Sequence, residues 1–410
     1  MACSTHADKR FDGQAPMTKS REPSRREFLA VSAVGLVGLA LPEKPQADTE
    51  MLYVGTYTEE GRTDGIYLVH MDRRSGKLRQ VGSVNAGPNP SFLAIHPNGR
   101  VLYAVNELEK YEGKDTGAVS ALAIATGTGA LSRLNEQASQ GGAPCFVSVD
   151  RSGRAAFVAN YAGGNVALLP IHADGTLAAA SDVEQHVGSG QDAVRKAAAH
   201  AHCIVTDSTN RFVLAADLGV DRVFVYRLDR DGKSLHHIES GDAVMRPGAG
   251  PRHLTFHPTL PLVFVANELD STVSTLRFDA EKGALSPLEI RSTVPAGWSG
   301  KNYPGDIHIS SSGRTLYVSN RGHNSIAVFS VAKSTGALAL EQVLSTEGDW
   351  PRNFSLDPTG RWLLVANQRS GSVVVFARNR DSGRLTPTRQ RIALPTPACV
   401  RFRAHTGPTA

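Results

Sequence analysis

Charged residues of opposite sign recur at two positions of a repeated strand pattern, and their types could support acid–base chemistry. His202, Arg252 and Arg352 each follow the residue that opens a predicted strand, whereas Glu268 and Arg321 each follow the Asn that ends the next strand. Arginine offers a planar pair of donors to a carboxylate or a developing oxyanion, and histidine gains or loses a proton near neutral pH. These residue types favour a site that binds a small anion or transfers an acyl group.

A repeated motif determines where these residues fall. Apolar and β-branched residues followed by Asn, or by Asp in one copy, recur about every fifty residues. We align Gly55 of a degenerate first copy with Asn106, Asn160, Asp217, Asn267, Asn320 and Asn367. An earlier alternating run, opened in most units by Pro, is joined to this motif by a tight turn, which predicts a β-hairpin. A third and a fourth run follow, and four short strands per unit predict a propeller blade.

The two ends of the repeat predict how the ring closes. The first unit begins at its second strand, Met51 to Tyr57, and the chain ends with a spare inner strand, Pro397 to Phe402. We therefore expect an all-β fold, a seven-bladed β-propeller of four-stranded blades, in which the C-terminal strand joins the N-terminal blade. Closure of this kind protects sheet edges that would otherwise be exposed.

In such a propeller the inner strands line the centre, and their starts lie beside the ends of the second strands. The two sets of residues should therefore form a ring at one mouth: Ser91, Cys145, His202, Arg252, Gly305 and Arg352 from the inner strands, with Glu107, Tyr161, Leu218, Glu268, Arg321 and Gln368 from the second strands. We take the catalytic group to be His202, Arg252, Glu268 and Arg321. The alternative is that these charges are ion pairs that join blades around a wet channel.

Other polar residues near the predicted mouth are weaker candidates. The substrate-binding candidates are Glu107, His253, His308, Arg352 and Asn353. Three loops that enter inner strands, Asp182 to Ala199, Gly241 to Gly250 and Pro295 to Tyr303, could add lids or cations. Cys145, Cys203 and Cys399 are interpreted as small buried residues. Because the chain has no Cys-x-x-Cys or His-Glu-x-x-His motif, its spacing predicts no metal site.

The N-terminal segment is typical of a twin-arginine export signal. Ser24-Arg25-Arg26-Glu27-Phe28-Leu29 precedes a weakly apolar run to Leu41, which is too short to span a bilayer comfortably, and then Lys44. We assign residues 1–47 to this signal, 48–405 to the propeller and 406–410 to a disordered tail. The mature protein should then be periplasmic or secreted, exported folded by the twin-arginine machinery and without a membrane anchor after cleavage. The alternative is an ordinary basic helix.

The overall charge gives little reason to expect a nucleic-acid partner. The formal net charge is +5 for 410 residues, which is a small excess. We expect a monomer whose partner is a small molecule.

Four segments resemble one known family, the seven-bladed propeller lactonases that include bacterial 6-phosphogluconolactonase and fungal muconate-lactonizing enzyme. The resemblance covers Met51 to Phe402 and is carried by Pro251-Arg252-His253-Leu254-Thr255-Phe256-His257-Pro258, Val265-Ala266-Asn267-Glu268-Leu269, Asp306-Ile307-His308-Ile309 and Pro351-Arg352-Asn353-Phe354. It implies hydrolysis of a sugar lactone without a cofactor. It also implies a catalytic group of one His, one Glu and two Arg, which match His202, Glu268, Arg252 and Arg321.

The roles and the substrate are expectations with stated alternatives. Arg252 and Arg321 would hold the lactone and stabilise the oxyanion, while Glu268 would activate water and His202 would protonate the departing ring oxygen, or Glu268 and His202 would exchange roles. An export signal favours an unphosphorylated aldonolactone over the phosphorylated cytoplasmic one. The rival functions are a binding propeller that captures a carboxylated ligand or a protein without turnover, and a reversible lactonizing enzyme that acts on an unsaturated dicarboxylate.

Overall fold

The structure is a computed structural model, and it describes residues 48–58, 62–188 and 198–403. The predicted export signal at 1–47 and the predicted tail at 406–410 lie outside the described residues. No helix within the described ranges is long and apolar enough to cross a membrane.

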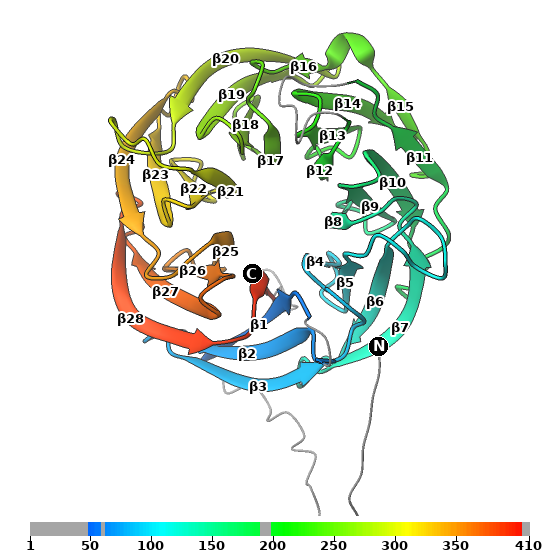
Figure 1. The fold of residues 1–410 in the computed structure, drawn as a ribbon, viewed down its shortest axis with the longest axis horizontal. Coiled ribbons are helices and arrows are strands. Elements are labelled where there is room, and N and C mark those ends of the chain that lie inside the picture. Colours follow the sequence, from blue (N-terminus) through cyan, green and yellow to red (C-terminus); the bar gives the residue numbers. More distant parts are fainter. Residues whose placement is uncertain (1–47, 59–61, 189–197, 404–410) are drawn as a thin grey trace, which may run out of the picture. The chain divides into compact units, whose positions relative to one another are not determined.

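Seven antiparallel sheets, numbered here as blades 1 to 7, follow one another around a ring in the described part of the chain (Figure 1). Blade 1 contains β29 (Pro397–Phe402), β1 (Thr49–Thr56), β2 (Ile66–Asp72) and β3 (Leu78–Val84). Blade 2 contains β4 (Leu93–Ile95), β5 (Val101–Asn106), β6 (Ala118–Ile124) and β7 (Leu131–Ala138). Blade 3 contains β8 (Pro144–Val149), β9 (Ala155–Asn160), β10 (Asn165–Pro170) and β11 (Asp182–Gln185).

Blade 4 carries a short fifth strand and a single 3₁₀ turn. It contains β12 (Ala201–Thr206), β13 (Phe212–Asp217), β14 (Arg222–Leu228), β15 (Leu235–His237), η1 (Glu239–Gly241) and β16 (Ala243–Val244). Blade 5 contains β17 (Pro251–Phe256), β18 (Leu262–Asn267), β19 (Thr272–Asp279) and β20 (Ala284–Ser292). Blade 6 contains β21 (Tyr303–Ile309), β22 (Thr315–Arg321), β23 (Ser325–Val331) and β24 (Leu338–Ser345). Blade 7 contains β25 (Pro351–Leu356), β26 (Trp362–Asn367), β27 (Ser372–Arg378) and β28 (Leu385–Ala393).

The predicted ring closure is confirmed. The C-terminal strand β29 pairs antiparallel with β1, with Leu52 opposite Phe402 and Val54 opposite Val400, so the two ends of the described chain share one sheet. Figure 1 shows the red β29 beside the blue β1. The sheet order β29-β1-β2-β3 completes blade 1 with the strand that its own sequence lacks.

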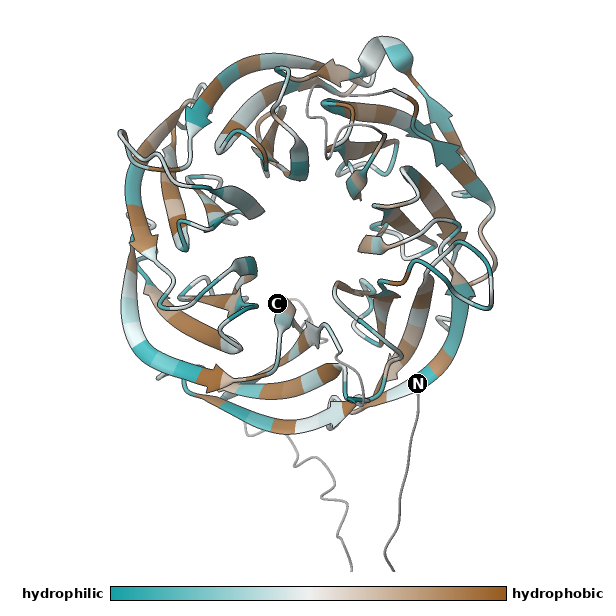
Figure 2. Ribbon diagram, in the orientation of Figure 1, coloured by the Kyte–Doolittle hydropathy of each residue, from teal (hydrophilic) through white to brown (hydrophobic). Residues whose placement is uncertain are grey.

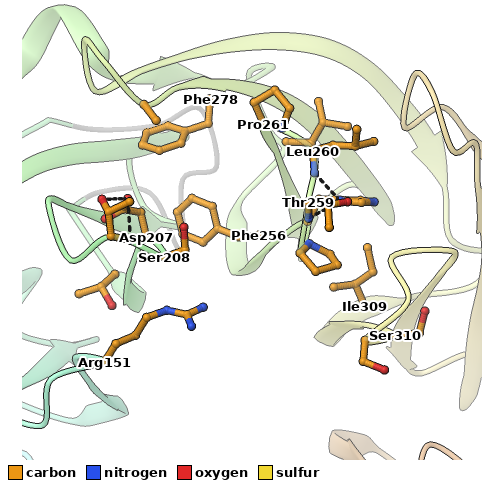
Figure 3. A pocket seen from close by; sticks show the side chains of 17 residues that line it. Arg151, Asp207, Ser208, Phe256, Thr259, Leu260, Pro261, Phe278, Ile309 and Ser310 are labelled. Carbon is orange, nitrogen blue, oxygen red and sulfur yellow. Dashed lines mark hydrogen bonds between the residues drawn. The ribbon is translucent and has the colours of Figure 1, made fainter.

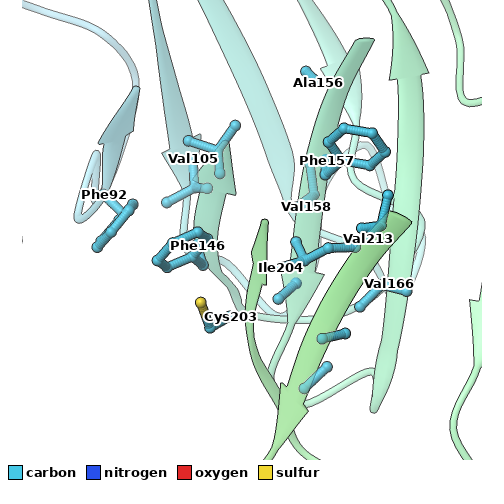
Figure 4. Close-up of a cluster of buried hydrophobic side chains, with 14 of the residues drawn as sticks. Phe92, Val105, Phe146, Ala156, Phe157, Val158, Val166, Cys203, Ile204 and Val213 are labelled. Carbon is cyan, nitrogen blue, oxygen red and sulfur yellow. The ribbon is translucent and has the colours of Figure 1, made fainter. Parts of the chain in front are cut away.

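The core lies in the inner and middle strands. Every residue of the second strands β5, β9, β13, β18 and β26 is buried, because each blade packs both faces against its neighbours. Outermost strands such as β24 and β28 are largely exposed, and Figure 2 shows hydrophilic and hydrophobic residues mixed along them. Figure 4 shows the buried contacts of blades 2 to 4, where Phe146 of β8 lies near Phe92 and Cys203 of β12. The three described cysteines are buried and unbridged, as predicted.

The loop prediction is wrong for parts of two segments. The segment Asp182 to Ala199 begins with β11, which pairs with β10 as the outer strand of blade 3. The segment Gly241 to Gly250 contains β16, which pairs with β14. Both strands are short, and β11 is polar, so strand pairing rather than local sequence determines them.

A bulge recurs at the start of the inner strands and re-aims one side chain there. In blades 3, 4, 5 and 7 the opening residue pairs with the last residue of the second strand, but the next pair skips one residue of the inner strand. The skipped residues are Cys145, His202, Arg252 and Arg352. A bulged residue leaves the regular alternation of the strand, which lets it point along the ring axis instead of into a neighbouring blade.

Deleting residues 397–410 should destabilise the whole ring, because it removes β29 and exposes the inner edge of β1. We expect the melting curve, monitored by circular dichroism, to lose its single cooperative transition, or its midpoint temperature to fall strongly. A chain shortened only by residues 404–410 keeps β29 and is the matched control. Normal cooperative melting of the longer deletion would contradict the closure argument.

Candidate active site

A small cavity lies at the mouth where inner strands begin and second strands end. Its volume is about 210 Å³, and its lining residues come from all seven blades: Tyr57, Glu107, Cys145, Tyr161, His202, Glu268, Arg321 and Arg352. Seven of these eight residues are members of the ring predicted from the repeat. The structure therefore brings together His202, Glu268 and Arg321 of the predicted catalytic group, with Glu107 and Arg352 of the weaker candidates.

The eighth lining residue, Tyr57, corrects the alignment of the first repeat. Pro397 of β29 pairs with Thr56, just as Pro144 pairs with Asn160 and Pro251 with Asn267. Thr56 rather than Gly55 is therefore the equivalent of the Asn positions, and Tyr57 takes the ring position that follows. A degenerate motif without Asn hides this one-residue shift, because the Pro that pairs with Thr56 lies at the other end of the chain.

Two arginines share one buried carboxylate at one side of the cavity. Oε2 of Glu268 lies 2.6 Å from a terminal nitrogen of Arg321 and 3.0 Å from Nε of Arg252. Arg321 also donates to the carbonyl oxygens of Tyr303 and Pro304, at 3.0 and 3.2 Å. The group joins blade 5 to blade 6, as the ion-pair alternative predicts, and two of its three residues, Glu268 and Arg321, also line the cavity.

Arg252 lies behind Glu268 and is not among the residues that line the cavity. Its side chain is only 2% exposed, and its terminal nitrogen donates to the carbonyl oxygen of Gly305. Burial, together with the positive charges of Arg321 and Arg352, lowers the pKa of Arg252 to about 9, so the guanidinium is still charged at neutral pH. That Arg252 holds the lactone directly stays a prediction, and Arg252 is absent from the residues that line the cavity. The two arginines on the cavity wall are Arg321 and Arg352.

His202 is a neutral imidazole in the cavity wall. Burial, followed by the charge of Arg252, holds the pKa of His202 well below its ordinary value of 6.5. Its Nδ1 lies 3.4 Å from Sγ of Cys145, and the ring of Tyr161 meets it edge-on at 5.5 Å between centroids. Burial also raises the pKa of Cys145, which keeps this neighbour a thiol. An uncharged imidazole can accept a proton at neutral pH.

A second carboxylate lies across the cavity and is held by hydroxyl groups. Oε2 of Glu107 accepts hydrogen bonds from Tyr57 Oη, at 2.7 Å, and from Ser91 Oγ. A terminal nitrogen of Arg352 lies 3.8 Å from the same oxygen, and its guanidinium carbon lies 5.2 Å from the centroid of the Tyr57 ring. Although burial opposes it, Tyr57 and Glu107 raise the pKa of Arg352, which stays charged.

Three predicted binding residues gather elsewhere. His253, His308 and Asn353 are absent from the cavity wall and instead contact one buried carboxylate, Asp306 of β21. The sequence motif contained Asp306, but nothing in its spacing singled it out. In blade 6, two residues, Gly305 and Asp306, fall between the paired positions Pro304 and Ile307, so the bulge there differs from those of the other blades.

The opposite mouth of the ring holds a larger cavity of another kind. It has a volume of about 430 Å³ and is formed by hairpin turns of blades 3 to 6, with Phe256, Phe278 and Ile309 in its wall (Figure 3). Its carboxylate, Asp207, accepts hydrogen bonds from backbone N–H groups of its own turn, which gives it a structural role. No group of three or more His, Cys, Asp or Glu within the described residues is arranged to hold a metal ion.

Comparisons with known proteins point to one family. The family described as "Lactonase, 7-bladed beta-propeller" matches residues 51–402. A 6-phosphogluconolactonase of Bacillus subtilis strain 168 is 37% identical over 350 residues, which cover 85% of this chain and 97% of that protein. A solved periplasmic gluconolactonase of Pseudomonas aeruginosa is 34% identical with a TM-score of 0.81, covering 87% of this chain and 99% of that one. A putative 6-phosphogluconolactonase of Bacteroides uniformis is similar at 33% identity and a TM-score of 0.80, covering 87% and 99%.

His202 should stay uncharged as the pH falls through 6.5, because burial and Arg252 disfavour its protonated form. We expect ¹⁵N-histidine NMR, with the His202 signal assigned by its loss in His202→Gln, to show a neutral ring at that pH. Replacing Arg252 with Met should raise the His202 pKa toward its ordinary value, though not fully, since burial remains. A wild-type His202 signal that titrates near 6.5 would contradict this account of the cavity.

Proposed function

The chain belongs to the seven-bladed β-propeller lactonases, and from this premise we propose that it hydrolyses an unphosphorylated sugar lactone, an aldonolactone, to the open-chain aldonic acid. The observation that carries the proposal is the cavity in which a neutral His202 lies near arginines that surround Glu268. A base and cationic donors in one cavity are the groups that water attack on an ester carbonyl requires.

The charge balance of the site suits a substrate that is neutral until it reacts. Among these three residues, the two guanidinium groups of Arg252 and Arg321 and the carboxylate of Glu268 sum to one positive charge. Arg352 and Glu107 offset each other across the cavity. One net positive charge complements the single negative charge that develops on the carbonyl oxygen during attack. A phosphate group would bring up to two further negative charges, and the described residues that line the cavity offer no additional unopposed cation for them.

In the proposed reaction His202 is the general base. It accepts a proton from the water that attacks the lactone carbonyl, because its imidazole is already neutral. Arg321 and Arg352 line the cavity and donate to the oxyanion of the tetrahedral intermediate. When the ring C–O bond breaks, the imidazolium of His202 returns the proton to the leaving alkoxide. Glu268 holds both neighbouring arginines, so its role is to fix their direction and to balance their charge.

We also propose that the reaction takes place outside the cytoplasm. The support is the pair Arg25 and Arg26 followed by Phe28 and Leu29 in a weakly apolar segment. A lactone outside the cytoplasm would be a product of sugar oxidation there rather than of a phosphorylated intracellular pathway, which agrees with the charge balance of the cavity.

The lactonase activity is tested by proton release from glucono-δ-lactone and from its 6-phosphate, after subtraction of spontaneous hydrolysis. We expect the unphosphorylated lactone to have the higher kcat/KM. His202→Gln should lower kcat by about 10²- to 10⁴-fold, the contribution typical of a general base. Arg321→Met should lower it by about 10²- to 10³-fold, as for loss of an oxyanion donor. His236→Gln, the same change in an exposed residue of β15, is the control and should keep full activity.

Rates at background for both lactones would overturn the lactonase proposal. Saturable binding of an aldonate without turnover would then identify a binding propeller. Cyclisation of an unsaturated dicarboxylate would identify the lactonizing enzyme instead.

Export is tested by fractionating cells that express the full-length chain in a bacterium with a twin-arginine pathway. Changing Arg25 and Arg26 together to Lys should keep the protein in the cytoplasmic fraction, since the pathway reads the arginine pair. Arg21→Lys, a change of the same type outside the pair, is the control and should leave export intact. Equal export of the double variant would contradict the assignment.

A further inference from the structure

A second buried polar group runs along the inner strands beside the cavity. Asp306 of β21 lies at its centre: Oδ1 is 2.8 Å from Nδ1 of His253 and Oδ2 is 2.9 Å from Nε2 of His308. The backbone N–H of Ile307 also donates to Oδ1, at 3.0 Å, and the side-chain amide of Asn353 donates to Oδ2. Both oxygens are therefore fully used as acceptors. Although burial opposes ionisation, His308 and His253 hold the pKa of Asp306 well below its ordinary value, so Asp306 is a carboxylate.

The partners of His253 determine its tautomer. Its Nε2 lies 3.1 Å from a terminal nitrogen of Arg252, and a guanidinium can only donate, so Nε2 must be the acceptor. The proton of the neutral ring is then on Nδ1, where it is donated to Asp306. Burial, with the charge of Arg252, lowers the pKa of His253 to about 3, so the ring is uncharged at neutral pH. The rings of Phe92 and Phe146 pack against it at steep angles, with 5.7 and 5.1 Å between ring centroids.

We propose that Asp306 is a positioning residue, which fixes His253 in its Nδ1–H tautomer and thereby aims Arg252 at Glu268. The inference rests on the proposed lactonase function for its kinetic consequence but on hydrogen-bond geometry for its existence. Arg252 is the shared element: one end of its guanidinium faces Glu268 Oε2, and the other end donates to His253 and to Gly305. Without an acceptor at His253 Nε2, the guanidinium would meet an N–H group and would have to turn away.

The same chain of contacts reaches the closing strand. Asn353 of β25, which donates to Asp306, accepts a hydrogen bond at 2.8 Å from the backbone N–H of Val400 in β29. The path therefore runs through four consecutive blades, from Val400 in blade 1 through blades 7 and 6 to Arg252 in blade 5. Closure of the ring and orientation of Arg252 are linked by side chains that are each nearly inaccessible to solvent.

The tautomer of His253 can be measured without reference to activity. Long-range ¹⁵N–¹H NMR of the full chain labelled with ¹⁵N-histidine, with His253 assigned by its loss in His253→Phe, should show a protonated Nδ1 and a bare Nε2 at neutral pH. A protonated Nε2 or an imidazolium would overturn the proposal, whether or not the protein is a lactonase. This measurement uses the wild-type ring, so it tests the proposed tautomer of His253 even if Asp306 variants do not fold.

The kinetic arm compares Asp306→Asn with Asp207→Asn, the same change at a buried carboxylate of a turn at the opposite mouth. We expect Asp306→Asn to lower kcat by about 10- to 100-fold, the range typical of partners that orient a functional group. It should also move the acid limb of the pH–rate profile toward neutral pH. The reason is that a displaced Arg252 no longer disfavours the protonated form of His202. Asp207→Asn should lower thermal stability and leave kcat and the pH profile unchanged.

A double-mutant cycle separates positioning from general destabilisation. If Asp306 acts through His253, Asp306→Asn should cause no further loss of kcat in a His253→Phe background. Additive losses, or wild-type kcat and an unshifted acid limb in Asp306→Asn, would overturn the proposal. Absence of lactonase activity in the wild-type protein would overturn the proposed function instead, and the NMR result would still decide the role of Asp306.

Discussion

The pairing of β29 with β1 is the constraint on which the site depends. Every blade contributes to the cavity wall, so the positions of the functional groups relative to one another are set by how the ring closes. In blades 3, 4, 5 and 7 the pairing of the first two strands places the bulged residue of the inner strand next to the residue that ends the second strand. Closure arranges the repeated blades in a ring, and the bulges direct side chains from the inner strands toward its mouth.

The repeat explains why the fold was predictable, and its irregular units explain what was missed. The period, the turns and the spare C-terminal strand predicted seven blades and the closing pair, because each blade must bury the same faces. The ring positions followed from strand ends alone, which is why His202, Glu268 and Arg321 were found together. Tyr57 was missed because Thr56 replaces Asn at the end of its strand.

Side-chain direction is what the sequence could not supply. Position after a strand end predicts that a residue is near the mouth, but not whether it faces the cavity or the space behind it. Arg252 and Arg352 occupy equivalent bulges, yet only Arg352 lines the cavity, because Arg252 is drawn back by Gly305, His253 and Glu268. His308 and Asn353 likewise turn toward Asp306, a partner in another repeat position that no spacing rule predicts.

Burying so many charges is not an efficient way to stabilise a ring. Removing one partner of a buried ion pair destabilises a protein by about 3–5 kcal/mol, whereas apolar replacement of the whole pair is often neutral. A ring needing only stability could therefore use hydrophobic residues at these positions, as it does in its middle strands. Retaining two arginines on one carboxylate, beside an imidazole kept neutral by burial and by the charge of Arg252, is explained if the group acts on a ligand. The same ion pairs then serve both purposes: they join blades 5 and 6, and they hold the cationic wall of the cavity in place.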